Sequence, residues 1–294
     1  MKDSKFYCYG DVKVGRGNFD LPPVLIGTQF YQGQSFIDRK NTEVFNERKA
    51  LKRINTHLSL SNQYKIPNFV EISATTPKAM VKYLDFYLEH FDPPFVLGGN
   101  IESRIAGVEY LNERGIEPNE YIYNTVSNLK NSKELELIKN FKISSVVVLI
   151  LGSENMTSTQ RFSYITEKNQ PNNSSILEGL KKLGVEKIWV DGGVINLESL
   201  AHVLETQQII SSSLELPVGT APNLFLFQFS SPRLNIKFHT RYRRASIMFI
   251  ATWFSNFIFY GAIEDAKESF SSAYQALEFR NIVKNRNIRL LKNH

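Results

Sequence analysis

The stretch that decides the fold is residues 94–125, which read Pro94-Phe-Val-Leu-Gly-Gly-Asn-Ile-Glu-Ser-Arg-Ile-Ala-Gly-Val-Glu-Tyr-Leu-Asn-Glu-Arg-Gly-Ile-Glu-Pro-Asn-Glu-Tyr-Ile-Tyr-Asn-Thr125. A short apolar run at 95–97 stops at two glycines, and apolar residues then recur at helical spacing as far as Gly115, a residue type common at helix ends. A second apolar run, 121–123, ends at Asn124. Strand, helix and strand in this order predict two parallel neighbours, because parallel strands need a long crossover connection.

The same alternation runs along the whole chain. It predicts eight strands, at 24–27, 68–73, 95–97, 121–123, 145–151, 187–191, 217–219 and 257–260. Helical patterns separate these strands, including 42–64 after the first and 262–280 after the last. The alternation predicts an α/β fold, a single (β/α)8 TIM barrel over residues 1–280, followed by a basic C-terminal tail at 281–294.

Three other segments carry separate predictions. Residues 5–18 hold short apolar runs between glycines, which predict a hairpin over the closed end of the barrel. Residues 153–173 are polar and predict a long loop over the opposite, open end. Residues 224–255 predict a basic helical stretch.

The composition excludes several classes of protein. No run of about 18 apolar residues occurs, so we expect no membrane span. The N-terminal residues lead into no apolar segment typical of a secretion signal, and we expect a cytoplasmic protein. Cys8 is the only cysteine, which excludes an internal disulfide and a cysteine-based zinc site. None of the five histidines ends a predicted strand, so no histidine metal site or Ser-His-Asp triad is expected.

The net charge of +6 is concentrated in two stretches near the C-terminus. Their basic residues are Arg233, Lys237, Arg241, Arg243 and Arg244 in the first, and Arg280, Lys284, Arg286, Arg289 and Lys292 in the second. Nucleic-acid binding is one interpretation. Solvated helix faces and a frayed tail are favoured, because no aromatic stacking motif is interleaved with these charges. No nucleic-acid partner is therefore expected.

Polar side chains stand at the ends of the predicted strands, which meet at the ligand-binding face of a parallel barrel. They are Thr28, Glu71, Asn100, Asn124, Ser153, Asn155, Asp191, Asn223 and Tyr260. Carboxylates accept hydrogen bonds from an amidine-like ring edge, and a carboxamide offers a donor and an acceptor, so this set suits a flat heterocycle. Asn124 and Asp191 could instead cap the helices that follow, and capping is favoured for either residue alone. For the two together with Glu71, both roles stay open.

Beyond these patterns, the sequence resembles a known family, the H subunit of tetrahydromethanopterin:coenzyme M methyltransferase. Collinear segments over nearly the whole chain carry the resemblance: Pro22-Pro-Val-Leu-Ile-Gly-Thr-Gln-Phe-Tyr31, 76–86, 94–95, 104–107, 121–125, 190–191, 217–219 and Phe259-Tyr-Gly-Ala-Ile-Glu264. The resemblance implies a barrel that binds a reduced pterin, tetrahydromethanopterin or tetrahydrofolate, and passes its N5-methyl group to the cobalt of a corrinoid on a partner protein. It also implies a homodimer, partner subunits and a place beside a membrane complex.

The resemblance also implies roles for single residues. Asn124 and Asp191 match an asparagine and an aspartate of the family, and would bind the pyrimidine edge of the pterin. Glu71 stands where the family has an aspartate and would assist by hydrogen bonding or proton supply, while Asn223 would act near N5; these two are the expected catalytic residues. Asn100 is expected in the same pocket by its place after the third strand.

Three departures from the family stand beside these matches. Leu97-Gly-Gly99 replaces Ile-Asp-Ser, so an acidic pterin contact is missing. If the chain is a weakened enzyme, we expect Gly98→Asp to tighten pterin binding or raise methyl transfer; if it is a binding module of another kind, we expect no change in pterin affinity. Asp191-Gly-Gly193 replaces Asp-Thr-Ala, and Pro217-Val-Gly-Thr-Ala-Pro-Asn223 is one residue shorter than Pro-Val-Gly-Cys-Gly-Pro-Ala-Asn. Three hypotheses follow: an active methyltransferase, a degenerate barrel that only binds a pterin or a partner subunit, and a basic scaffold that docks on an acidic partner.

Overall fold

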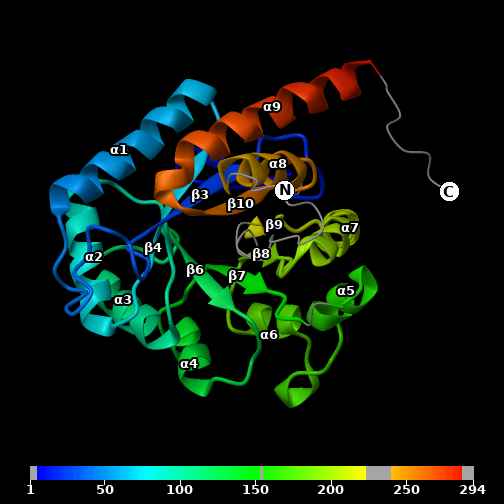
Figure 1. Cartoon of the computed structure of the whole chain (residues 1–294). Coiled ribbons are helices and arrows are strands. Elements are labelled where there is room, and N and C mark those ends of the chain that lie inside the picture. Colours follow the sequence, from blue (N-terminus) through cyan, green and yellow to red (C-terminus); the bar gives the residue numbers. More distant parts are fainter. Residues whose placement is uncertain (1–4, 153–154, 223–239, 287–294) are drawn as a thin grey trace.

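The computed structural model describes residues 5–152, 155–222 and 240–286 (Figure 1). Eight parallel strands close into a barrel in the order β10-β3-β4-β5-β6-β7-β8-β9, which confirms the predicted fold. The strands are β3 (Val24–Gln29), β4 (Asn68–Ile72), β5 (Phe95–Leu97), β6 (Tyr121–Val126), β7 (Ser145–Leu149), β8 (Lys187–Asp191), β9 (Val218–Thr220) and β10 (Phe257–Ala262).

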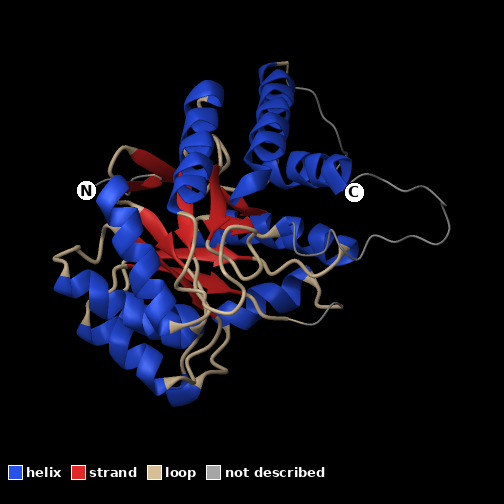
Figure 2. Cartoon of the chain, turned by 60° about the vertical axis from the view of Figure 1, so that its left-hand side comes forward, coloured by secondary structure: helices blue, strands red, loops and turns tan. Residues whose placement is uncertain are grey.

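Helices surround the strands on the outside of the barrel (Figure 2). They are α1 (Glu47–Tyr64), α2 (Pro77–His90), α3 (Ile101–Glu113), α4 (Ser132–Asn140), α5 (Ser158–Thr166), α6 (Ile176–Lys182), α7 (Leu197–Leu214), α8 (Thr240–Thr252) and α9 (Ala266–Asn285), with short 3-10 turns η1 (Pro171–Asn173) and η3 (Ile263–Asp265). Side-chain caps fix several of their starts; Thr76 caps α2, for example, with Pro77 at the first helical position. Of the basic helical stretch predicted at 224–255, α8 is the described part, and 224–239 lie outside the described residues. Among the helices of the described ranges, none combines the length and apolarity that a membrane crossing needs.

The inside of the barrel is filled by a layered apolar cluster. Its strand residues are Val24, Ile26, Phe69, Val96, Ile122, Val147, Trp189, Phe257 and Phe259. Because side chains alternate between the two faces of a strand, the residue two positions further along also points inward. By this rule the side chains of Glu71, Asn124 and Asp191 also point inward, because each follows an inward-pointing residue (Phe69, Ile122 or Trp189) by two positions. The next inward layer, towards the carboxyl ends of the strands, is therefore polar.

The N-terminal hairpin closes the other end of the barrel, as predicted. Its strands are β1 (Phe6–Tyr9) and β2 (Val12–Gly15), paired antiparallel. The buried Tyr9 hydroxyl accepts a hydrogen bond from Trp189 Nε1 at 2.8 Å and bonds Ser145 Oγ at 2.5 Å. Ser145 is the first residue of β7, so this contact lies at the amino ends of the strands. The hairpin thus leaves the carboxyl ends open.

The polar segment predicted as a long loop instead contains a helix. Within 153–173 the chain forms α5, Ser158–Thr166, followed by η1. The prediction is wrong because few apolar residues of α5 pack on the core, Phe162 and Ile165 among them, too few to give a clear periodicity. A signal was present: Thr157 and Gln160 form a capping box at its start.

Two helix boundaries also differ from the prediction. The first helix begins at Glu47 rather than at residue 42, because the Asn46 side chain accepts from Lys49 N and caps it. The last helix continues to Asn285, past the predicted boundary at 280. Arg280 is not a solvated charge: it is buried and donates to the carbonyls of Thr252 and Leu21. The predicted tail at 281–294 therefore begins as an ordered helix.

Candidate functional site

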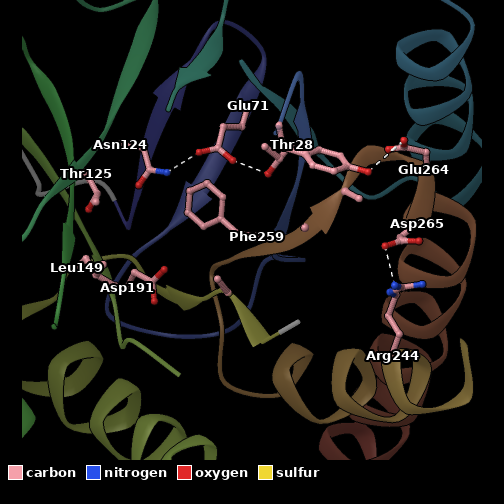
Figure 3. Close-up of a pocket in the computed structure, with 14 residues that line it drawn as sticks. Thr28, Glu71, Asn124, Thr125, Leu149, Asp191, Arg244, Phe259, Glu264 and Asp265 are labelled. Atoms are coloured by element: carbon pink, nitrogen blue, oxygen red, sulfur yellow. Dashed lines mark hydrogen bonds and ion pairs between the residues drawn. The ribbon is translucent and has the colours of Figure 1, made fainter. Parts of the chain in front are cut away.

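A cavity of about 760 Å³ opens at the carboxyl ends of the strands (Figure 3). It is lined by Thr28, Tyr31, Glu71, Asn124, Thr125, Leu149, Asp191, Ala221, Arg244, Phe259, Gly261, Ala262, Glu264 and Asp265. Glu71, Asn124 and Asp191 therefore share one pocket, as the sequence predicts. Asn223 and Ser153 lie outside the described residues.

Glu71 is the centre of a hydrogen-bonded row along one side of the cavity (Figure 3). Its Oε2 accepts from Thr28 Oγ1 at 2.5 Å, and its Oε1 accepts from Asn124 Nδ2 at 2.7 Å. Burial raises the pKa of the Glu71 carboxyl, against the two hydrogen bonds and the charge of Arg104, which lower it. The row fixes the Asn124 amide, so its Oδ1 is presented as an acceptor.

A local irregularity in β6 brings a second residue to the cavity. The pairing register of β6 with β7 shifts between Asn124 and Val126, so Thr125 is an extra residue in the strand. Such bulges redirect side chains and are frequent beside functional sites. Here the shift lets both Asn124 and Thr125 line the cavity, while Thr125 Oγ1 donates to the Val147 carbonyl at 2.7 Å.

Asp191 is the second buried carboxylate of the cavity. Its Oδ1 accepts a hydrogen bond from the amide of Gly193 at 2.9 Å. Burial raises the pKa of Asp191 to about 7; the Gly193 hydrogen bond lowers the pKa, the charge of Glu71 raises it, and the charge of Arg161 lowers it. Near neutral pH this carboxyl therefore exchanges between an acceptor and a donor form.

Gly98 directly follows β5, two residues after the inward-pointing Val96, and lies in the same layer. A Cβ at this glycine would overlap Glu71 Oε1 and would lie 2.9 Å from its Cδ. The Glu71 side chain therefore reaches from β4 across the position of Gly98 to Asn124 on β6. The space that a third-strand carboxylate would fill is occupied by the longer carboxylate of the second strand.

Asn100 does not line the cavity, so its predicted place in the pocket is wrong. It is the N-cap of α3: its Oδ1 accepts from Ser103 N at 2.8 Å, and its Nδ2 donates to the Thr75 carbonyl at 2.8 Å. Gly98 is the last residue at an inward position, and the turn through Gly99 carries the chain to the outer helix. Tyr260, another strand-end residue, also points outward, where its hydroxyl bonds His57 Nδ1 at 2.7 Å.

The opposite wall of the cavity did not emerge from the sequence patterns. Arg244 pairs with Asp265 at 2.8 Å, and Arg53 pairs with Glu264 at 2.7 Å. Tyr31 donates to Glu264 at 3.3 Å. Burial raises the pKa of Asp265 to about 6, against the charge of Arg244. Tyr31 and Glu264 end two of the segments that carry the family resemblance, a signal that could have identified this wall.

Two buried arginines hold the turns that follow β5 and β8. Arg104, on α3, donates to the carbonyls of Gly99 and Thr125 and pairs with Glu134 at 2.7 Å. Arg161, on α5, donates to the carbonyls of Met156, Gly192 and Gly193 at 2.7–3.1 Å. Neither residue was singled out by its spacing, since both sit on helices outside the barrel.

With this geometry in place, the comparisons with known proteins are decisive. A family model described as the tetrahydromethanopterin S-methyltransferase MtrH subunit matches residues 2–287. The chain belongs to this family. Among MtrH relatives, the tetrahydromethanopterin S-methyltransferase H subunit from Methanothermobacter marburgensis is 33% identical over 210 residues, which cover 71% of this chain and 67% of the relative. The H subunit from Methanopyrus kandleri is 25% identical over 225 residues, covering 76% and 70%.

Solved structures show that the MtrH barrel shares its fold with other proteins. Dihydropteroate synthase of Yersinia pestis matches with a TM-score of 0.61 at 13% identity, over 94% of this chain and 99% of the enzyme. The dihydropteroate synthase of Thermus thermophilus matches with a TM-score of 0.55 at 12% identity, over 89% and 95%. At this identity the likeness concerns the fold alone.

Proposed function

We propose that this protein is a methyltransferase subunit that binds an N5-methylated reduced pterin in the cavity and passes the methyl group to the cobalt of a corrinoid on a partner protein. The observation that carries the proposal is the inward layer of Glu71, Asn124 and Asp191 in a chain of the MtrH family. The name of that family supplies the pterin, tetrahydromethanopterin, and the methyl transfer.

The polar layer has the chemistry that a pterin requires. The pyrimidine edge of a pterin offers a ring N–H and an amino group, and a carboxylate such as Asp191 accepts both. Asn124 can add its Oδ1 as a hydrogen-bond acceptor for the same edge. Phe259 and Leu149 line the same cavity and supply apolar contact for the faces of the ring. We therefore assign pterin binding to Asp191 and Asn124.

The transfer itself requires the pterin nitrogen to be a good leaving group. The bond between N5 and the methyl carbon breaks, its electron pair stays on N5, and a new bond forms between the methyl carbon and cobalt(I) of the acceptor. A proton or a hydrogen bond at N5 favours this step. Glu71, a buried carboxyl of the cavity whose pKa is raised by burial, is the candidate for that role among the described residues. Asn223 stays a second candidate by its place after β9.

A non-catalytic subunit that only binds a pterin or a partner is the second candidate function. It is favoured by Gly98, which leaves the third strand without an acidic side chain. The carboxylate of Glu71 in that same space weakens this interpretation, because the layer still contains two carboxylates.

Partners and assembly are further parts of the proposal. We expect a corrinoid-binding protein and other methyltransferase subunits as partners, in the cytoplasm beside a membrane complex. A homodimer is also expected, and the apolar side chains of α8 and α9 support it: Ile250, Phe279 and Ile282 are 41%, 42% and 49% exposed. Sedimentation should show a dimer that Phe279→Glu weakens.

The decisive experiment is direct titration of the protein with methyl-tetrahydromethanopterin and methyl-tetrahydrofolate, followed by methyl transfer to a cobalt(I) corrinoid, monitored by its spectrum. Asn124→Ala should weaken binding of the pterin that the wild-type protein takes. Asn100→Ala is the matched control: it removes an asparagine that caps α3 outside the cavity, and should cost about 1 kcal/mol of stability without changing affinity. Failure of the wild-type protein to bind either pterin would refute the proposal.

A further inference from the structure

Arg161 and Asp191 are joined through a single peptide group. Arg161 Nη1 donates to the carbonyl oxygen of Gly192 at 2.7 Å. The amide N–H of Gly193 belongs to the same peptide unit, and it donates to Asp191 Oδ1 at 2.9 Å. A cation at the oxygen and an anion at the N–H both polarise the peptide in the same sense. Each of the two hydrogen bonds therefore strengthens the other.

The turn that carries this peptide depends on its two glycines. Gly193 has φ of +70°, a conformation that other residues rarely adopt, and a Cβ there would overlap the carbonyl oxygen of Ile150. A Cβ at Gly192 would lie 2.5 Å from a methyl carbon of Val203. The backbone is therefore packed closely on both sides, and the peptide has little freedom to rotate.

The charge of Arg161 is not neutralised elsewhere in the described part of the chain. The side chain is fully buried, and its hydrogen bonds go to carbonyl oxygens only. It forms no ion pair with any described residue, and its Nη2 has no hydrogen-bond partner there. A buried guanidinium without a carboxylate is costly. The carboxylate whose charge acts on Arg161 is Asp191.

We propose that Arg161 is a positioning residue for Asp191. Through the Gly192–Gly193 peptide, Arg161 fixes the direction of the Asp191 carboxylate in the cavity and favours its ionised form. The importance of that carboxylate for a ligand rests on the proposed function. Arg161 itself does not line the cavity, so its effect on any ligand is transmitted by Asp191.

Other charges also act on Asp191 and define what the loss of Arg161 would do. Glu71 faces it from β4 and favours the neutral form, whereas Arg161 acts from α5 in the opposite sense. The remaining charged side chains of the cavity are Arg244, Glu264 and Asp265, on α8 and η3. Without Arg161, the effect of Glu71 is no longer opposed by a cation from α5. The pKa of Asp191 should then rise above its value of about 7.

The first test uses the ligand-free wild-type protein and needs no variant of Arg161. Nuclear magnetic resonance would follow the labelled aspartate carboxyl carbons, the Gly193 amide and the arginine side chains from pH 5 to 9, with Asp191→Asn to assign the carboxyl. The Gly193 amide and the Arg161 guanidinium should titrate with the midpoint of Asp191, and the Arg104 guanidinium should not. Absence of a response at Gly193 and Arg161 would overturn the inference, whether or not any pterin binds.

The second test compares Arg161→Gln, Arg161→Lys and Arg104→Gln. The Asp191 midpoint should rise by about one pH unit in Arg161→Gln, remain near the wild-type value in Arg161→Lys, and be unchanged in Arg104→Gln. A one-unit rise from 7 lowers the ionised fraction at pH 7 about fivefold and leaves it nearly unchanged at pH 9. Affinity for methyl-tetrahydromethanopterin or methyl-tetrahydrofolate should follow this pattern.

An unchanged midpoint, or an affinity loss equal at both pH values, would show that Arg161 is only structural. If Arg161→Gln does not fold, the titration of the wild-type protein decides the inference. If neither pterin binds, the proposed function fails, and the titration still tests the role of Arg161.

Discussion

The mouth of the barrel contains two Gly-Gly turns that are built alike. Gly98-Gly99 follows β5 and Gly192-Gly193 follows β8, and the second glycine of each has a positive φ, +98° and +70°. In each turn a Cβ on the second glycine would overlap the backbone carbonyl oxygen of a residue that follows an earlier strand: Ala74 for Gly99, and Ile150 for Gly193. A buried arginine from a neighbouring helix binds carbonyl oxygens of each turn.

The two turns differ in what balances the arginine. Arg104 pairs with Glu134 at 2.7 Å, and Tyr123 donates to the same carboxylate at 2.7 Å. Arg161 has no such partner among the described residues, and its charge acts on Asp191. Both arginines lower the pKa of a carboxyl in the cavity, Arg104 that of Glu71 and Arg161 that of Asp191. The difference is that Arg104 also has an ion-pair partner, whereas Arg161 has none among the described residues.

The largest effect is expected from removing the carboxylate that the second turn holds. Asp191→Ala should lower pterin affinity by two or more orders of magnitude, since charge-assisted hydrogen bonds are each worth roughly 1.5–3 kcal/mol and a factor of ten corresponds to about 1.4 kcal/mol. Calorimetric titration would measure the loss. Thermal unfolding should show a folded variant, and an affinity within threefold of wild type would remove Asp191 from the site.

The first turn offers the next largest effect, and the structure reverses the expectation from the sequence. Gly98→Asp should weaken pterin binding about tenfold rather than tighten it, because a Cβ at position 98 overlaps Glu71 Oε1 and must displace Glu71 from Asn124. The double variant Gly98→Asp with Glu71→Ala should recover part of the loss, since the new carboxylate then has the vacated space. Tighter binding in the single variant would mean that Glu71 moves without cost.

A third prediction concerns the free energy of unfolding, which the ionised Asp191 carboxylate lowers. Its pKa in the folded protein, about 7, lies above the ordinary value of 3.8, so the folded state binds more protons between these values and the contribution of Asp191 to stability is lost as pH rises to 7. Asp191→Asn does not titrate. It should therefore be more stable than wild type by about 1–3 kcal/mol at pH 8, which denaturant unfolding would measure.

The gain should disappear towards pH 4. There Asp191 is protonated in the folded state of the wild-type protein and about 40% protonated in the unfolded state, so the two proteins differ little. His57 has the opposite sign: burial lowers its pKa to about 4, so the unfolded state binds more protons below pH 6.5 and stability falls on acidification. In Asp191→Asn this slope is no longer offset by Asp191, and the variant should lose stability steadily from pH 6.5 to 4. A gain that is independent of pH would contradict the raised pKa.

The sequence predicted three residues of the site from their places at the ends of predicted strands and from the family resemblance. Alternation along a strand explains why these side chains point inward: Glu71 and Asp191 follow the inward-pointing Phe69 and Trp189 by two positions. The rule stops where the strand stops: Asn100 lies in a turn beyond Gly98, and there its direction is set by the helix that it caps. How far a side chain extends is equally hard to predict. Glu71 extends across the neighbouring strand position only because that position is Gly98, which has no side chain.

The helical contributions were missed for a different reason. Arg161 lies on α5, whose polar sequence gives little periodicity, and its contacts go to backbone carbonyls, which carry no sequence signal. The wall formed by Arg244 and Asp265 depends on how α8 and η3 pack over the mouth, a tertiary arrangement with no local pattern. Strand positions were thus readable from the sequence, whereas the groups that tune their charges were not.

The smallest predicted effect makes the first turn resemble the second. Glu134→Gln removes the negative charge beside Arg104 while keeping an oxygen that can accept from Arg104 and Tyr123. The charge of Arg104 already lowers the pKa of Glu71, and in this variant Arg104 would no longer have its ion-pair partner. We expect the Glu71 pKa to fall and stability to fall by about 1–2 kcal/mol, since a buried guanidinium loses its counter-charge. Carboxyl resonances of labelled glutamate would measure the first effect and denaturant unfolding the second.

The Asp191 midpoint should not move, because Arg104 contacts the other turn. A matching shift at Asp191 would show that the two arginines act on one shared network, and the distinction between the turns would be lost.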